Sequence, residues 1–303
     1  MGAPKGFLAA LFFLFGCSTD HEQLYQLMRK GKVENNHLCD TLYLVDSILP
    51  IVTLQHGKQR QKWLIDTGLP CLSPAVKPQV HLPLMNAEGD TLANSFGQVQ
   101  APLIVGKRVI TDLTAGLPSA SANRMMDSIG VQGILGANLM QHSTWHFDWK
   151  RRIVIIAPST DQFEKQPSSV AISFNRTIHR VPKCQVKFNR FPYQLVGYIS
   201  TGFAGGVLLD EEFSGNYTSF MYEYPLQGLH WQKGLHQAKA LRGRLTDSIC
   251  IEGSIRYDRL PVGLSQSKYG LLGLALLQRQ NITLDWKKRK MWLHGSNLHG
   301  CDW

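Results

Sequence analysis

The chain has 303 residues, of which 44% are hydrophobic and 18% charged, so it can bury a large core in one domain or in two lobes. No long low-complexity tract interrupts it, which excludes a mainly disordered protein. The formal net charge is +10, but the cations form no stripe interleaved with aromatic residues and no nucleic-acid-binding motif accompanies them. We therefore expect no nucleic-acid partner.

Residues 1–16 are typical of a signal peptide, because a lysine precedes an apolar run at 7–15 that is too short to span a bilayer as a helix. The run ends in Leu-Phe-Gly followed by Cys17, which resembles the cleavage site of a bacterial lipoprotein. That resemblance implies lipidation of Cys17 and, because Ser18 follows, a place in the cell envelope on the outer membrane, facing the periplasm. The alternative is an ordinary secretory signal with a coincidental cysteine.

Residues 17–40 are mostly polar, with a short helical pattern around 22–29, and we expect them to tether the lipid to the folded body. From residue 41 onward the chain is rich in β-type runs separated by turn residues. In the first half, residues 41–157, strands are expected at 42–45, 49–54, 61–65, 102–105, 108–110 and 153–156, with turns at 56–58 and 106–107.

Residues 158–169 contain proline and serine and form the expected linker. The second half, 170–303, repeats the order of the first, with strands expected at 170–174, 184–188, 193–199, 249–251, 254–257 and 260–262. Helical patterns are sparse, and the two best lie at matching places, 136–141 and 273–279.

One motif occurs twice along this chain. Trp-Leu-Ile-Asp-Thr-Gly at 63–68 corresponds to Gly-Tyr-Ile-Ser-Thr-Gly at 197–202. An apolar-apolar-Gly segment follows each copy, and the spacing from Asp66 to Gly136 is nearly the same as that from Ser200 to Gly273. Nine positions between 133 and 152 then recur in the second half at one constant offset, which indicates an internal duplication of a lobe-sized unit.

An apolar strand that runs into Asp-Thr-Gly, with an apolar-apolar-Gly segment later in the same half, resembles the aspartic peptidases of the pepsin and retropepsin kind. The resemblance covers roughly residues 40–295. It implies an all-β, two-lobed acid-protease fold, with lobes at 41–157 and 170–303 whose loops meet at the interface. By resemblance, Asp66 is the catalytic carboxylate, Ser200 occupies the partner position, and Thr67, Gly68, Thr201 and Gly202 position the loops.

The serine at position 200 is a departure from the family, which uses two aspartates that share one proton. A hydroxyl can orient a water molecule but cannot act as a base near neutral pH, and loss of an acid–base partner typically costs about 10² to 10⁴-fold in rate. Ser200 also lacks the Gly-x-Ser-x-Gly setting of a serine nucleophile.

Three functions remain open on this evidence. The first is an aspartic-type endopeptidase of reduced activity, and the second is an inactive pseudoprotease that binds or scaffolds peptides. Both would engage a peptide or protein in the cleft between lobes, would attach to the membrane only through the N-terminal lipid and would need no cofactor or metal. The third is an envelope lipoprotein that uses the fold only as a surface.

Other candidate residues have plainer explanations. Cys71 is expected to be a small buried residue behind the Asp66 loop, not a reactive thiol. His142 and His146 are four residues apart, but a third ligand is not evident, so no metal site is expected. The resemblance also implies a hairpin flap that covers the cleft, expected at 86–100. Phe96 is the only aromatic residue of this segment.

Two basic runs, 150–152 and 287–290, occupy the same place in the repeat, between Asp-Trp and an apolar strand. Their position predicts solvated hairpin turns. His179 is expected to be a surface residue.

Overall fold

The structure is a computed structural model that describes residues 20–85, 91–161, 163, 169–187, 194–203, 205–210, 221–226, 241–246, 248–251, 255–258, 260–265 and 270–295. The expected signal peptide and Cys17 lie outside these residues, as do 86–90 of the expected flap and 164–168 of the expected linker.

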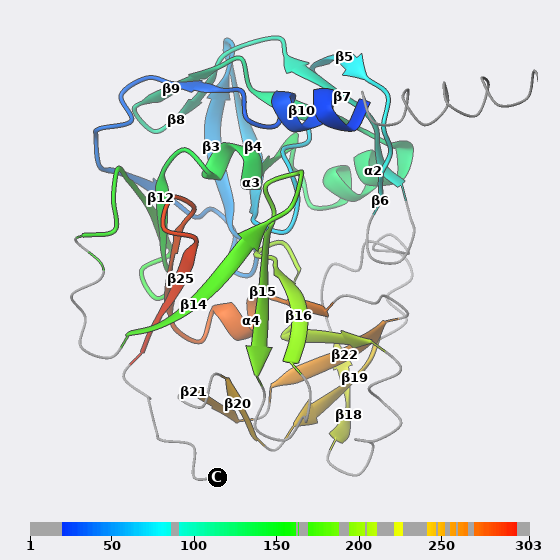
Figure 1. The fold of residues 1–303 in the computed structure, drawn as a ribbon, viewed down its shortest axis with the longest axis vertical. Coiled ribbons are helices and arrows are strands. Elements are labelled where there is room, and N and C mark those ends of the chain that lie inside the picture. Colours follow the sequence, from blue (N-terminus) through cyan, green and yellow to red (C-terminus); the bar gives the residue numbers. More distant parts are fainter. Residues whose placement is uncertain are drawn as a thin grey trace, which may run out of the picture.

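The described chain is mostly β-structure in two lobes, as the sequence predicts (Figure 1). Besides a helix at residues 20–27, the described residues form three helices: α2 (Ala120–Ser128), α3 (Ala137–Met140) and α4 (Leu274–Leu277). The first lobe contains β1 (Lys32–Val33), β2 (Asp40–Tyr43), β3 (Ile51–His56), β4 (Gln59–Asp66), β5 (Val76–Val80), β6 (Leu84–Met85), β7 (Thr91–Val99), β8 (Leu103–Val105), β9 (Arg108–Thr111), β10 (Thr114–Pro118), β11 (Gly133–Gly136), β12 (Thr144–Asp148) and β13 (Ile153–Ala157).

The second lobe repeats this plan with strands that follow the linker region. They are β14 (Ser169–Arg176), β15 (Pro182–Lys187), β16 (Gln194–Ile199), β17 (Val207–Asp210), β18 (Met221–Leu226), β19 (Leu241–Thr246), β20 (Ser248–Ile251), β21 (Ile255–Asp258), β22 (Pro261–Ser265), β23 (Gly270–Leu272), β24 (Asn281–Asp285) and β25 (Lys290–His294).

Both lobes use the same strand pairing around the duplicated motif. In the first lobe β11 pairs in parallel with β4, which places Gly136 beside Asp66. In the second, β23 pairs in parallel with β16, which places Leu272 beside Ile199, directly before Ser200. The short helices α3 and α4 follow these strands at the two places where the sequence predicts helix.

The lobes share one sheet, because β12 of the first lobe pairs antiparallel with β24 of the second. We call the run β14-β25-β24-β12-β13-β2 the interlobe sheet; each lobe contributes three of its strands. His146 lies opposite Thr283 in this pairing, and these two residues occupy the same position of the two repeats. The axis that relates the two lobes therefore passes between them.

The two basic runs form tight turns between paired strands, as predicted. Asp148 Oδ1 accepts a hydrogen bond of 3.0 Å from Arg151 N, and Asp285 Oδ1 accepts one of 2.8 Å from Lys288 N. These matching contacts close the β12–β13 and β24–β25 hairpins.

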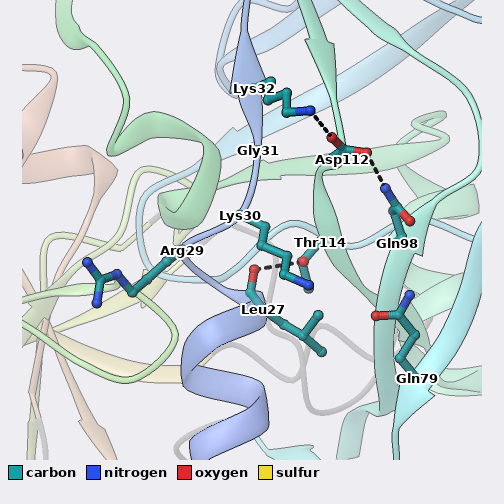
Figure 2. Close-up of a pocket in the computed structure, with 9 residues that line it drawn as sticks. All are labelled: Leu27, Arg29, Lys30, Gly31, Lys32, Gln79, Gln98, Asp112 and Thr114. Atoms are coloured by element: carbon teal, nitrogen blue, oxygen red, sulfur yellow. Dashed lines mark hydrogen bonds and ion pairs between the residues drawn. The ribbon is translucent and has the colours of Figure 1, made fainter.

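The sequence predicts a tether for residues 17–40, but the described part of this segment, residues 20–40, packs against the first lobe. Residues 20–27 form a helix, and Leu24, Leu27 and Met28 are buried against the first lobe. Figure 2 shows the junction after this helix, where the Thr114 hydroxyl donates 2.8 Å to the Leu27 carbonyl. β1 then pairs with β9 before the interlobe sheet begins at β2.

Candidate functional site

The duplicated motifs come together at the interface between the lobes. Asp66 ends β4, and Ser200 directly follows β16. Ser200 Oγ donates a hydrogen bond of 2.9 Å to Asp66 Oδ1, and both side chains are buried. Two residues that are far apart in the sequence therefore form one contact, as the resemblance predicts.

The two threonines lock the loops together with symmetric hydrogen bonds. Thr67 Oγ1 donates 2.6 Å to Ile199 O, and Thr201 Oγ1 donates 2.8 Å to Ile65 O. Each hydroxyl also accepts the other threonine's backbone N–H, at 3.2 Å from Thr67 N and 3.1 Å from Thr201 N. Each lobe thus supplies the same bonds to the other, with both threonine side chains fully buried.

The glycines after the threonines allow the loops to approach this closely. A Cβ added at Gly68 would lie 2.6 Å from Ser200 Cβ, and one added at Gly202 would lie 2.4 Å from Asp66 Oδ2. Any other residue would collide with the opposite loop, so the glycines are needed for space.

The Asp66 carboxylate is held asymmetrically. Its Oδ1 accepts three hydrogen bonds, from Gly68 N at 2.8 Å, Ser200 Oγ at 2.9 Å and Gly202 N at 3.1 Å. Its Oδ2 is buried and has no hydrogen-bond partner among the described residues. Burial raises the pKa of Asp66, while the bonds from Gly68, Ser200 and Gly202 oppose that rise by stabilising the anion.

The Ser200 hydroxyl uses both its donor and its acceptor in hydrogen bonds within the loops. It donates to Asp66 and accepts a 3.1 Å bond from Phe203 N. None of the hydrogen bonds described for Ser200 involves a histidine, so the geometry provides no base to activate it as a nucleophile.

Cys71 and Asn138 support the Asp66 loop from behind. Cys71 is fully buried, its Sγ accepts a 3.1 Å bond from Gly136 N, and burial raises the pKa of its thiol to about 12. Asn138 Oδ1 accepts 2.7 Å from Cys71 N, and its Nδ2 donates 2.7 Å to Thr114 O. The sequence analysis missed Asn138; the available signal was a lone amide in a short apolar helix, where the second repeat has Ala275.

Phe96 and His179 lie together, although the sequence suggests no link between them. Phe96 is fully buried in β7, and its ring stacks on that of His179 with centroids 5.5 Å apart. The expectation that His179 is a surface residue is therefore wrong, because the β14–β15 turn of the second lobe packs against the first and covers much of this side chain. Burial lowers the pKa of His179 to about 4.

His146 belongs to the interlobe sheet. Its Nδ1 lies 2.8 Å from Thr283 Oγ1. Among the described residues, no three or more His, Cys, Asp or Glu side chains gather as metal ligands would. In the same part of the chain, no helix is long and apolar enough to cross a membrane.

Comparison with known proteins supports the fold alone. No family model matches the sequence, and no curated protein matches it. Among solved structures, the crystal structure of basic 7S globulin from soybean matches with a TM-score of 0.52 at 11% identity, covering 86% of this chain and 95% of that one. The likeness spans both lobes. The chain therefore has the all-β, two-lobed pepsin-like fold that the resemblance of its motifs implies.

Proposed function

We propose that this protein binds extended peptides between its lobes and hydrolyses them far more slowly than an enzyme with two catalytic carboxylates. One observation carries the proposal: a single buried carboxylate, Asp66, faces the Ser200 hydroxyl where the two duplicated loops meet. The threonine bonds hold the two loops together around this pair.

Hydrolysis by this class of site needs one group to take a proton from the attacking water and another to give a proton to the peptide carbonyl. Asp66 can perform at most one of these tasks at a time. Ser200 cannot perform the other, because its proton is directed at Asp66 Oδ1 and its oxygen accepts from Phe203 N. The chemical step is therefore impaired.

Peptide engagement would use the exposed backbone of an extended ligand, as in other strand-like recognition modes. We include in the proposal that the protein is exported and anchored in the cell envelope through Cys17, with a peptide or protein as its partner. This part rests on the sequence of residues 1–17.

A second candidate is a scaffold that binds peptide without any cleavage. It is favoured by the full use of the Ser200 hydroxyl within the loops. The two candidates differ only in whether wild type retains residual turnover that depends on Asp66.

The test compares wild type, Asp66→Asn and Ser200→Asp, with Asp127→Asn on the exposed face of α2 as a matched control. Each protein is incubated with a mixed peptide library between pH 3 and 8, and both cleavage products and bound peptides are identified by mass spectrometry. We expect trace cleavage by wild type and by the control, and none by Asp66→Asn. Ser200→Asp should cleave about 10²-fold faster or more, because it restores the second carboxylate.

Equal cleavage by wild type and Asp66→Asn would contradict a role for the carboxylate. Peptide capture without any Asp66-dependent cleavage would select the scaffold. Absence of both capture and cleavage from every variant that melts like wild type would exclude both candidates.

A further inference from the structure

A hollow lies between the N-terminal helix and the second lobe, and three arginines are among the residues that line it. Its volume is about 720 Å³. The helix contributes one wall, the β14–β15 turn another and the β24–β25 turn the third. The lining residues are His21, Glu22, Tyr25, Asn175, Arg176, Thr177, Ile178, Arg180 and Arg289, which we call the arginine pocket.

Arg180 lines this pocket and is only 6% exposed. Its Nε and Nη2 are buried without a hydrogen-bond partner among the described residues. Its guanidinium lies over the Tyr25 ring, 4.7 Å from the centroid, which leaves the in-plane donors free. A buried guanidinium with unused donors is costly unless an acceptor arrives to meet them.

The other charges in the pocket do not neutralise Arg180. The pKa of Arg176 is lowered mainly by burial and further by the guanidiniums of Arg180 and Arg289, which therefore repel the Arg176 cation. Glu22 is the only acidic residue in the lining, and it already accepts a 2.6 Å bond from Gln26 Nε2. The pocket therefore carries a net positive charge that an anion would relieve.

The backbone holds these arginines in place before any ligand binds. Arg180 N donates 3.0 Å to Thr177 O, and the Arg180 carbonyl accepts 3.2 Å from Trp286 Nε1. The Arg289 carbonyl accepts 3.0 Å from Phe174 N. Both arginines have positive φ, 69° and 54°, an uncommon conformation that the surrounding bonds maintain.

The duplicated fold does not itself require this cluster. Arg152 is the first-lobe equivalent of Arg289, and its guanidinium instead donates 3.4 Å to Leu44 O. The β14–β15 turn of the second lobe corresponds to the β2–β3 turn of the first lobe. That turn contains Asp46, whose carboxylate accepts hydrogen bonds from Ile48 N and Leu49 N. The first lobe thus keeps an arginine at the position of Arg289 but directs its guanidinium to a backbone carbonyl, and an aspartate closes its β2–β3 turn.

A second basic hollow, of about 460 Å³, lies at the end of the same helix (Figure 2). There Lys32 pairs with Asp112 at 3.3 Å, and the Gln98 amide donates to the same carboxylate. Its charge is partly met within the protein, so the arginine pocket is the stronger anion site.

We propose that the arginine pocket binds a phosphate group, with Arg176, Arg180 and Arg289 donating to its oxygens beside the Tyr25 ring. Phosphate fits better than carboxylate because it offers more charge and more acceptor oxygens to three neighbouring guanidiniums. The group can belong to a soluble phosphate compound or to a phospholipid headgroup. The proposal does not depend on peptide binding at Asp66.

The experiment measures pyrophosphate binding to the full chain by calorimetry, with succinate as the carboxylate comparison. We expect pyrophosphate to bind more tightly than succinate. Arg180→Met and Arg289→Asn should each weaken pyrophosphate binding about tenfold or more, since each removes charged hydrogen bonds. Arg152→Asn removes the same charge at the equivalent place of the other lobe and should change binding by less than about twofold.

Flotation with phosphatidylcholine vesicles, with and without phosphatidic acid, identifies the source of the phosphate. Arg289-dependent binding only to phosphatidic acid vesicles indicates a lipid headgroup, and Arg289-dependent pyrophosphate binding indicates a soluble ligand. If Arg180→Met fails to fold, Arg176→Gln replaces it, because Arg176 is only partly buried. Absence of binding in both assays, or equal losses from Arg152→Asn and Arg289→Asn, would overturn the proposal.

Discussion

At the scale of single residues, the two copies of the motif meet closely although they differ at one position, where the first has Asp66 and the second has Ser200. Ser200 donates to Asp66, and the backbone N–H of Gly202 donates to the same carboxylate oxygen. The cause is that loop closure depends on the threonines and glycines, which both copies of the motif retain. Loop closure therefore depends on other side chains than the two that differ.

Thr67→Val and Thr201→Val should each destabilise the protein by about 2–4 kcal/mol, because each leaves a buried carbonyl and a buried N–H without a partner. The two losses should be similar, since the bonds are symmetric, and the double variant should lose less than their sum. Urea unfolding measures the free energies, with exposed Thr41→Val as the control. A loss at either threonine no larger than that of a neutral surface substitution, below about 0.5 kcal/mol, would show that these bonds do not hold the lobes together.

The motif residues could be predicted from sequence because each lies in a short local pattern. Asp66, Ser200 and their threonines and glycines are adjacent in the chain and occur twice. Asn138 and Arg180 could not be predicted in this way. Their roles arise from contacts with Cys71 and Tyr25, which belong to separate segments.

At the scale of elements, strands with an alternating or continuous apolar pattern were predictable, and more polar ones were not. The expected runs at 49–54, 61–65 and 153–156 correspond to β3, β4 and β13. β7, by contrast, contains Asn, Ser, Gly and Gln and was not expected as a strand, yet it pairs with β10 and β5. Its conformation is imposed by its neighbours, which override weak local preference.

Helix α2 was also not predicted, although its start carries a recognisable signal. Ser119 caps the helix, with its Oγ accepting 3.2 Å from Ala122 N. The helix is short, and it buries Ala122, Met125 and Met126 against the first-lobe sheet. Packing of that one face, which the sequence analysis did not identify, stabilises it.

The N-terminal helix provides the test at this scale. Leu24→Ala should destabilise the protein by about 2–4 kcal/mol, because Leu24 is 2% exposed and its removal leaves a cavity beside the first lobe. Exposed Gln23→Ala should change stability by less than about 0.5 kcal/mol. Thermal and urea unfolding measure both. An unchanged stability in Leu24→Ala would mean that residues 20–27 behave as the free tether that the polar composition suggested.

At the scale of the whole molecule, the interlobe sheet joins the lobes through a buried chain of polar side chains. His146 Nδ1 lies 2.8 Å from Thr283 Oγ1, which lies 2.7 Å from His294 Nε2. Ser169 Oγ in turn lies 2.7 Å from His294 Nδ1. Burial lowers the pKa of His294 to about 4. The pKa of His146 is also lowered to about 4, by burial and by the neighbouring His294, and Asp148 opposes this shift by a smaller amount.

These histidines predict that acid weakens the protein. An unfolded histidine takes up a proton near its usual pKa of about 6.5, whereas the folded ones remain neutral until about pH 4. The unfolded state therefore binds more protons between those values, and the free energy of unfolding falls as the pH falls through this window. Each histidine should contribute a loss of about 2 kcal/mol, less than the full shift implies, because solvent screens part of the charge.

Urea unfolding at pH 7.5, 6, 5 and 4 measures this loss in wild type, His146→Gln and exposed His37→Gln. His146→Gln should show a smaller decline than wild type, and His37→Gln should follow wild type. His142 and His179 also have lowered pKa values and add to the wild-type slope, so the difference between variants isolates His146. A His146→Gln slope equal to that of wild type would contradict the assignment.

The amino-acid sequence by itself determined the duplication and the repeated β-strand pattern, because both depend on short patterns that recur at matched spacing. The resemblance that rests on these motifs implied the two-lobed fold and the meeting of Asp66 with Ser200. Only the tertiary structure decided that the N-terminal helix packs on the body, that His146 joins the lobes and that Arg180 lines a cationic pocket beside Tyr25. These contacts bring together segments far apart in the chain. Their energies come from burial and from partners that no local pattern specifies.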